Sequence, residues 1–436
     1  MKHLKSILSI LLLVSLVLSL SACGSVKNTS GPTLSFAGDS ASSSFDSIAV
    51  NSIESSAASK KSDGGIESLI EGTKETFSES ESILTPPEIF YDDSDSQIWH
   101  DPNAEAFILT AAEWNDNDNW GFFRNLVNNG TINYPQFGLN PMNRIKVTVT
   151  DDSGKPVANE KVLLMASDNV IFRSVTDKNG IAYTFYNNET PTSIVVNEEL
   201  YELGITTVDD QQGSDYTAVE DIEITLNKQN KIVGTQIMFI VDTTGSMGDE
   251  ITYLQKDFSS IVDEIKGSNL EYSVNFYKDT DDRYVTSCND FTPSVKNVQQ
   301  KLNAEYAEGG GDFPEAVAQI LAETITQNTS WKDDCNKIAF MIFDAPPHDG
   351  TDATIKDAID VAAARGIRLI PVVSSGSDRD TELFARAMAI YTNGTYVFLT
   401  DDSGVGGSHL EPIVGDYEVD LLHNIIVNII NRYIVQ

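Results

Sequence analysis

The chain has 436 residues, which is enough for two or three domains. It holds 29 Lys and Arg against 65 Asp and Glu, a net charge of −36, so its surface repels the phosphates of nucleic acids and excludes them as partners. Hydrophobic residues make up 41%, which excludes global disorder and allows a packed core.

The N-terminus has the pattern of a signal peptide over residues 1–22. Lys2 and Lys5 precede an apolar run at 7–20, which is too short for a membrane span. The following "LSAC", which ends at Cys23, resembles a bacterial lipobox. That resemblance implies cleavage before Cys23, lipidation of this cysteine, and attachment to the extracytoplasmic side of the cell membrane. The alternative is an ordinary secretory signal with an incidental cysteine.

The next two segments differ sharply in composition. Residues 23–85 are rich in Ser, Gly, Asp and Glu, which predicts a flexible tether after the lipidated cysteine. Residues 86–142 bring aromatic side chains together, including Trp114 and Trp120, which predicts a packed lead-in segment.

Residues 143–230 read as six or seven short strands, the number expected of a small all-β sandwich. Asn179-Gly180 predicts a hairpin turn between strands at 170–177 and 181–186. The segment resembles immunoglobulin-like or carboxypeptidase-regulatory-like modules of secreted bacterial proteins, which implies a spacer or binding module.

Residues 233–436 alternate apolar strands with amphipathic helices. This pattern predicts an α/β fold with a doubly wound, mainly parallel sheet, whose ligands bind at the carboxyl ends of the strands. The predicted strands are 235–242, 271–279, 337–344, 367–375 and 395–401, and the predicted helices are 249–265, 293–305, 314–327, 353–364, 381–392 and 417–434.

Three loops rich in oxygen donors follow these strands. They are "DTTGS" at 242–246, "EGGGDFPEA" at 308–316 and "FDAPPH" at 343–348. Carboxylate and hydroxyl oxygens that converge from several loops are the ligands that Mg²⁺ or Mn²⁺ prefers. We therefore predict a metal site of Asp242, Thr244, Ser246, Asp312 and Asp344.

These motifs, in this order, resemble those of von Willebrand factor type A domains with a metal-ion-dependent adhesion site. Asp242-Thr243-Thr244-Gly245-Ser246 is similar to the family's Asp-x-Ser-x-Ser, and Asp344 to its last acidic residue. The resemblance implies that Thr244 and Ser246 bind the ion directly, Asp242 and Asp344 largely through water. It also implies a divalent cation, Mg²⁺ first with Mn²⁺ or Ca²⁺ as alternatives, and a partner that supplies the last ligand.

Asp312 departs from the family pattern, which has a Thr on the second loop. Asp312 with Glu315 three residues on also reads as a helix capping box. The sequence leaves open whether Asp312 binds the metal directly, acts through a metal-bound water, or caps a helix.

Two other polar features call for an interpretation. We interpret Asp279, Asp281 and Asp282 as a solvated acidic hairpin rather than a second cation site. The family's strand order, 3-2-1-4-5-6, places Cys288 on an edge strand and Cys335 before the fourth strand. They are then about 14 Å apart, so we predict that they form no disulfide.

The sequence predicts a cell-surface lipoprotein that binds an unidentified protein or other extracellular ligand through a metal site, and not an enzyme. One alternative is a hydrolase, because Ser246, Asp344 and His348 follow the order of α/β-hydrolase triads. Thr244 occupies a position where that motif needs Gly, which argues against it. The other alternative is a purely structural envelope spacer.

Overall fold

A computed structural model describes residues 109–204, 206–208, 215–217, 221–403 and 408–434. The predicted signal peptide 1–22, Cys23, the tether 23–85 and the first part of the lead-in lie outside these residues. Within the described ranges, no helix is both long and apolar enough to cross a membrane.

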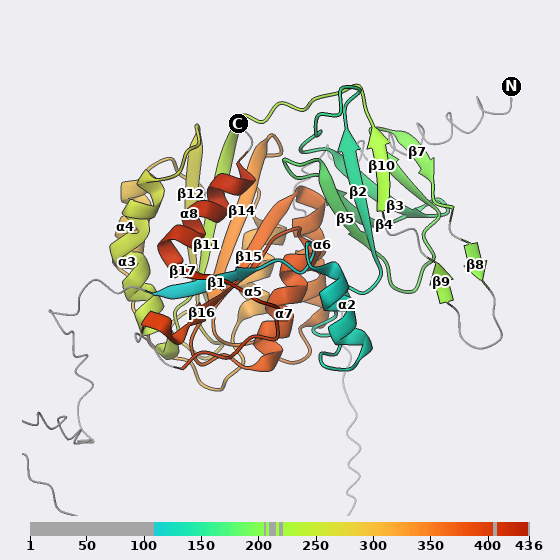
Figure 1. Cartoon of the computed structure of the whole chain (residues 1–436). Helices are drawn as coiled ribbons and strands as arrows, with labels where there is room; N and C mark the ends of the chain where they lie inside the picture. Colours follow the sequence, from blue (N-terminus) through green and yellow to red (C-terminus); the bar gives the residue numbers. More distant parts are fainter. Residues whose placement is uncertain (1–108, 205, 209–214, 218–220, 404–407, 435–436) are drawn as a thin grey trace, which may run out of the picture. The chain divides into compact units, whose positions relative to one another are not determined.

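An eight-stranded sheet forms the centre of the described part (Figure 1). Its order is β13-β12-β11-β14-β15-β16-β1-β17, so the predicted 3-2-1-4-5-6 arrangement is confirmed and extended by two strands. The pairs from β12 to β16 are parallel, whereas β13 and β1 run antiparallel to their neighbours. The strands are β1 (Thr110–Trp114), β11 (Gly234–Asp242), β12 (Leu270–Tyr277), β13 (Thr286–Ser287), β14 (Cys335–Phe343), β15 (Ile367–Val373), β16 (Tyr396–Thr400) and β17 (Val419–Leu421).

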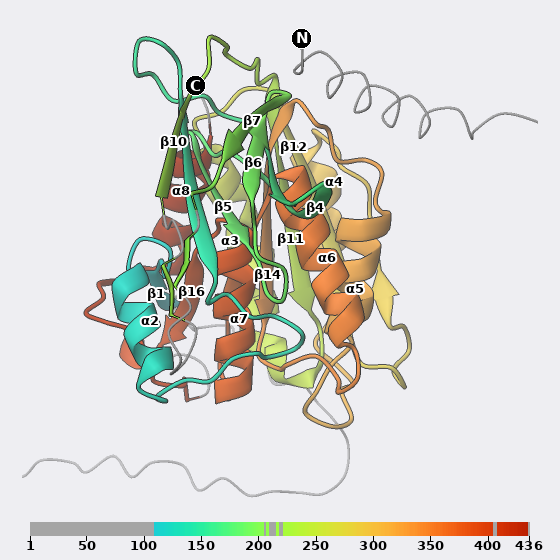
Figure 2. The ribbon, with the colours of Figure 1, turned by 90° about the vertical axis from the view of Figure 1, so that its right-hand side faces the viewer.

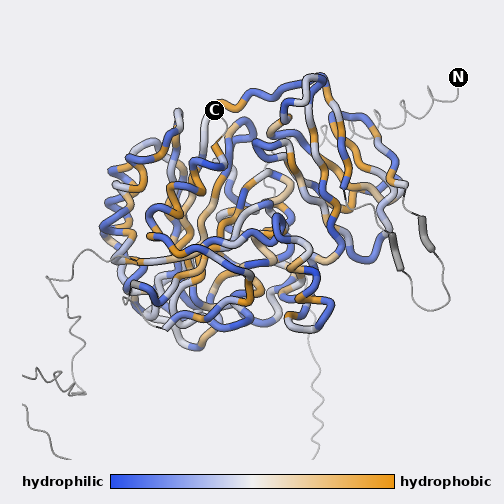
Figure 3. The backbone as a smooth tube through the Cα atoms, viewed as in Figure 1, coloured by the Kyte–Doolittle hydropathy of each residue, from blue (hydrophilic) through white to orange (hydrophobic). Residues whose placement is uncertain are grey.

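Helices cover both faces of this sheet, which explains why its strands are apolar almost throughout (Figures 2 and 3). Along β11, Ile237 and Phe239 pack on one face with α3, α4 and α8. Met238 and Ile240 pack on the other face with α5, α6 and α7. The helices are α2 (Trp120–Asn128), α3 (Gly248–Asp263), α4 (Val295–Leu302), α5 (Val317–Leu321), α6 (Asp352–Arg365), α7 (Arg379–Tyr391) and α8 (Leu422–Tyr433), with short 3-10 helices at Gly245–Met247 and Asp401–Ser403 and a π-helix at Ala322–Gln327 that continues α5.

The last helix is shorter than the predicted 417–434. Residues Val419–Leu421 form the edge strand β17, which pairs with β1, and α8 begins only at Leu422. The apolar spacing did predict a helix in this segment. Pairing with β1 holds the first residues of the predicted helix in an extended conformation.

Residues 144–225 form smaller sheets with orders β10-β2-β5 and β4-β3-β6-β7, and β8 pairs with β9. The predicted hairpin is wrong, because β4 pairs with β3 and β5 pairs with β2. The Asp177–Gly180 turn does form, but it carries the chain from one sheet to the other. The strands are β2 (Arg144–Thr150), β3 (Lys161–Ala166), β4 (Asn169–Val175), β5 (Ile181–Phe185), β6 (Ser193–Val196), β7 (Glu199–Glu202), β8 (Thr206–Val208), β9 (Asp215–Thr217) and β10 (Asp221–Thr225).

Strand β1 lies where the sequence predicted only a lead-in. It inserts between β16 and β17, and its Ala111 and Ala112 are fully buried. Just after it, Asp116 forms a buried ion pair with Arg386 of α7, 2.7 Å between oxygen and nitrogen. The chain therefore enters the large sheet first, leaves to form the small sheets, and returns at β11.

Both described cysteines are free thiols. Cys288 directly follows the edge strand β13, and Cys335 is the first residue of β14. The Cys288 thiol donates a hydrogen bond to the Glu323 carboxylate at 3.3 Å.

Candidate metal centre

The first loop of the site begins where the central strand β11 ends. Asp242 is fully buried, and its Oδ1 accepts hydrogen bonds from the Thr244 backbone N–H at 2.9 Å and from the Thr244 hydroxyl at 2.7 Å. These bonds fold residues 242–244 into a tight turn. The turn places the hydroxyl oxygens of Thr244 and Ser246 3.5 Å apart.

The other two loops complete a pocket over this turn. Asp344 follows β14, the neighbour of β11 in the sheet, so both acids lie at the carboxyl edge of the sheet. Four of the five predicted residues line the pocket, and the fifth, Asp242, lies buried beneath Thr244. The lining residues are Thr244, Gly245, Ser246, Gly309, Gly310, Asp312, Phe313, Glu315, Asp344, Ala345 and Gly376.

The buried acids of the site hold protons more tightly than exposed acids do. Burial, helped by the charge of Asp344, raises the pKa of Asp242 to about 7, against the effect of the hydrogen bonds from Thr244. Burial also raises the pKa of Asp344. The Tyr277 hydroxyl is close enough to lower the pKa of Asp242. Asp242 Oδ2 and the Tyr277 hydroxyl are nevertheless both buried without a hydrogen bond of normal geometry among the described residues, so Oδ2 is available to a cation or a water.

Two further buried acids were not predicted as site residues. Glu315 lines the pocket, and burial together with the charges of Asp242 and Asp279 raises its pKa to about 9. Glu250 lies in the first turn of α3 and accepts hydrogen bonds from Ser375; burial raises its pKa to about 7. Each has one buried carboxylate oxygen without a partner in the described structure.

The capping-box interpretation of Asp312 and Glu315 is wrong. Helix α5 begins at Val317 with Ala316 as its N-cap, and no side chain caps it. Instead, the Glu315 backbone N–H donates to the Pro346 carbonyl at 3.0 Å, which ties the second loop to the third. The sequence "FPEA" does show an acidic residue near the start of a helix. Whether the Glu315 side chain caps that helix or faces the pocket depends on the residue at which the helix begins.

A buried lysine holds the first and second loops together. The Lys278 ammonium donates to the backbone carbonyls of Thr243, Tyr306 and Glu308, the last at 2.8 Å. Burial lowers the pKa of Lys278. This cation sits beneath the acidic loops, where it binds carbonyl oxygens from both.

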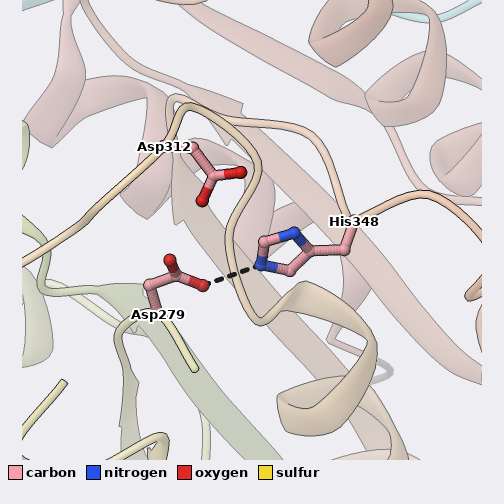
Figure 4. A group of neighbouring side chains, drawn as sticks. All are labelled: Asp279, Asp312 and His348. Carbon is pink, nitrogen blue, oxygen red and sulfur yellow. Dashed lines mark hydrogen bonds and ion pairs between the residues drawn. The ribbon is translucent and has the colours of Figure 1, made fainter. Parts of the chain in front are cut away.

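His348 does not pair with Ser246 or Asp344 as a hydrolase triad requires. Its Nε2 lies 2.7 Å from Oδ1 of Asp279, at the end of β12. Asp279 is buried, 5% exposed, so the interpretation of a fully solvated acidic hairpin is wrong at this residue. Asp312 joins this pair, as Figure 4 shows.

Comparison with known proteins identifies the domain that carries these loops. Residues 236–407 match the family model described as von Willebrand factor A domain. This part of the chain is a von Willebrand factor A domain. Such domains mediate protein interaction or adhesion, and their α/β fold agrees with the mixed, mostly parallel sheet.

Two relatives are similar to part of the chain. An ariadne-like RING finger protein of Acanthamoeba polyphaga mimivirus is 28% identical over 186 residues, 37% of this chain and 18% of the relative. An alpha-protein kinase of Dictyostelium discoideum is 26% identical over 155 residues, 34% of this chain and 24% of the relative. The chain thus covers less than a quarter of either relative's length.

Proposed function

We propose that the von Willebrand factor A domain binds a divalent cation and, through it, a protein partner outside the cytoplasm. The observation that carries the proposal is Asp242 Oδ2, a buried carboxylate oxygen without a partner, beneath a pocket lined by Thr244, Ser246 and Asp344. A buried carboxylate is costly unless a proton or a cation compensates it.

The donors fit a hard cation such as Mg²⁺, with Mn²⁺ and Ca²⁺ as alternatives. Asp242, Thr244, Ser246 and Asp344 offer only oxygen atoms, which these ions prefer. The two carboxylates balance the charge of a dication. When bound, the ion supplies a Lewis-acidic position that an oxygen atom of a partner can fill.

The rim of the pocket favours a protein as that partner. Phe313 lines it and is 43% exposed, although it is a large apolar side chain. Tyr306, two residues before the loop 308–316, is 60% exposed but does not line the pocket. Exposed aromatic side chains around a polar centre are typical of protein-binding surfaces.

Calorimetry with Mg²⁺ and Mn²⁺ tests the metal site. We expect the parent chain to bind, and Asp242→Asn or Ser246→Ala to weaken binding at least about ten-fold. Asp281→Asn is the matched control, because it removes an exposed carboxylate from the neighbouring loop. The proposal fails if the parent binds neither ion or if Asp242→Asn binds as the parent does.

We further propose that lipidation of Cys23 holds the protein on the extracytoplasmic face of the cell membrane. The lipobox-like "LSAC" after the apolar run supports this. Labelled fatty acid should be incorporated into the parent chain in a bacterial host and not into Cys23→Ser. Equal labelling of the parent chain and of Cys23→Ser would contradict this proposal.

The names of the two relatives do not argue for an enzyme here. The matches cover only 18% and 24% of those proteins, so RING or kinase chemistry is not inferred for this chain. The hydrolase alternative also lacks support, because the His348 ring pairs with Asp279. The domain binds a partner in our proposal, and the small sheets at 144–225 act as a spacer or second binding module.

A further inference from the structure

A second group of metal-ligating side chains lies beside the pocket. Asp279 follows β12, Asp312 belongs to the loop 308–316, and His348 belongs to the loop after β14 (Figure 4). Each offers one ligand atom, and these atoms lie within 4.8 Å of one another. Three separate loops thus bring two carboxylates and one imidazole to a single point.

We propose that Asp279, Asp312 and His348 bind a second divalent ion, of the transition-metal class represented by Zn²⁺. An imidazole nitrogen is a good ligand for Zn²⁺ and its neighbours in the first transition row, whereas Mg²⁺ and Ca²⁺ prefer oxygen alone. The proposed Mg²⁺ site contains no nitrogen donor. The two sites therefore differ in the ion that each selects, and this second site does not depend on the proposed function.

The separations of the three ligand atoms suit one ion. Ligand atoms that each lie about 2.1 Å from a tetrahedral ion are about 3.4 Å apart. His348 Nε2 and Asp279 Oδ1 are 2.7 Å apart, so an ion would replace the proton that they share. Asp312 is exposed, and its side chain can move the short remaining distance.

Two of the three proposed ligands, Asp279 and His348, are already held in place by other hydrogen bonds. Asp279 Oδ1 accepts a hydrogen bond from the Thr280 backbone N–H at 2.6 Å, and the Thr351 hydroxyl donates to the His348 carbonyl at 2.6 Å. Such supporting contacts orient metal ligands before the ion arrives. The imidazole side chain is 25% exposed, so an ion from solvent can reach it.

Glu315 is a further buried acid in the pocket that Asp312 also lines. Glu315 is 4% exposed, its Oε2 has no partner among the described residues, and it shares the pocket with Asp312. The charge of Asp279 is among the causes that raise its pKa. Glu315 therefore carries a proton near neutral pH in the metal-free protein, and no cationic side chain in the described hydrogen-bond network pairs with it.

The test is calorimetry of the metal-free full chain with Zn²⁺ in excess Mg²⁺, which occupies the first site. We expect His348→Gln and Asp312→Asn each to weaken Zn²⁺ binding at least about ten-fold. Asp312 is exposed, so its variant should fold even if His348→Gln does not. Ser246→Ala should keep Zn²⁺ binding and lose the response to Mg²⁺, which separates this proposal from the proposed function.

His423→Gln is the matched control. His423 also contacts two carboxylates, but Asp257 and Glu264 approach its opposite ring nitrogens, at 2.7 and 3.2 Å, so the three cannot share one ion. Its replacement should leave Zn²⁺ affinity unchanged. Zn²⁺ binding as tight in His348→Gln or Asp312→Asn as in the parent, or no binding to the parent, would overturn the proposal.

Discussion

At the scale of single residues, the site contains buried carboxyl groups that carry protons in the folded chain when no metal is bound. The pKa values of Asp242 and Glu250 are raised to about 7, and that of Glu315 to about 9, chiefly by burial. An unfolded chain would release these protons at a pH near 4. Folding and protonation are therefore coupled at these three acids.

This coupling predicts that the metal-free protein loses stability as the pH rises. Between about pH 4 and the raised pKa values, the folded state binds protons that the unfolded state has released, so the free energy of unfolding falls with pH. Each pKa unit corresponds to about 1.4 kcal/mol. We expect the Tm in EDTA to fall by several degrees from pH 5 to pH 9, and Mg²⁺ to restore more of it at higher pH.

Thermal melts of the parent and of Asp242→Asn measure this effect. His423, whose pKa is raised by its hydrogen bonds to Asp257 and Glu264 against the effect of burial, also loses stabilisation as pH rises. The difference between the two proteins isolates Asp242, since both contain His423. Identical slopes of Tm against pH in EDTA would contradict the assignment of this group.

The sequence predicted the positions of those site residues that a strand end fixes. Asp242 is the last residue of β11, Thr244 and Ser246 lie on the turn after it, and Asp344 follows β14, so their positions depend on local order alone. Glu315 could not be assigned in this way. Its role depends on where α5 begins and on the hydrogen bond of its backbone to Pro346, and a single sequence shows neither.

At the scale of elements, the glycine loop 308–316 places both candidate sites. Gly309 and Gly310 have φ values of +81° and +83°, which favour glycine. The Gly310 N–H donates to Asp282 Oδ2 at 2.8 Å, and Asp282 Oδ2 also accepts from the Asp279 N–H at 3.0 Å. The loop is thus tied to the end of β12 through one carboxylate.

Gly309→Ala should disturb the metal sites more than it disturbs the fold. A Cβ at Gly309 would lie 2.0 Å from Asp282 Oδ1, so either the Asp282 carboxylate or the loop must move, and the link between them is disturbed. Gly350→Ala is the control, because Gly350 has a φ of +78° but nothing within 4 Å of the added Cβ. Both variants pay about 1 kcal/mol for the left-handed backbone.

Calorimetry and thermal melts of the two glycine variants separate these effects. We expect Gly309→Ala to bind Mg²⁺ about ten-fold more weakly, which is about 1.4 kcal/mol. Gly350→Ala should lose stability and keep its affinity. Equal Mg²⁺ affinities in both variants would show that the loop position does not matter to the site.

Strand and helix types were predictable in the large sheet because their apolar patterns are strong and local. The pairing partners of the strands were less predictable. The Asp177–Gly180 turn looks like a hairpin turn, yet β4 and β5 enter different sheets, because β4 pairs with β3 and β5 pairs with β2. Strand β1 was missed for a related reason. Its five residues, TAAEW, carry no periodicity of their own and are strand only between β16 and β17.

At the scale of the molecule, the small sheets interrupt the large one in sequence and pack against it in space. Tyr391 at the end of α7 stacks on Phe185 of β5, with 4.3 Å between ring centroids. The Arg368 guanidinium of β15 donates to the Val175 carbonyl of β4 at 2.8 Å. One hydrophobic cluster includes residues of both parts. We therefore expect residues 233–436 to depend on the small sheets for part of their stability.

This arrangement predicts that a fragment of residues 233–436 is much less stable than a fragment of residues 109–436. The shorter fragment lacks β1, so β17 loses the strand that it pairs with and β16 keeps only β15. It also lacks Asp116, which pairs with the fully buried Arg386. Removing one partner of a buried ion pair costs about 3–5 kcal/mol, because the other charge stays buried.

Thermal melts and limited proteolysis of the two fragments measure the difference in stability. Asp116→Asn in the longer fragment shows how much of the lost stability comes from the ion pair. Glu382 remains within 3.3 Å of Arg386 in every case, so the variant should retain part of the stability. The remaining difference then belongs to β1 and the small sheets. If the 233–436 fragment melts at the same temperature as 109–436, then the large sheet needs neither β1 nor the small sheets for its stability. Metal measurements on such a fragment would then be as informative as those on the full chain.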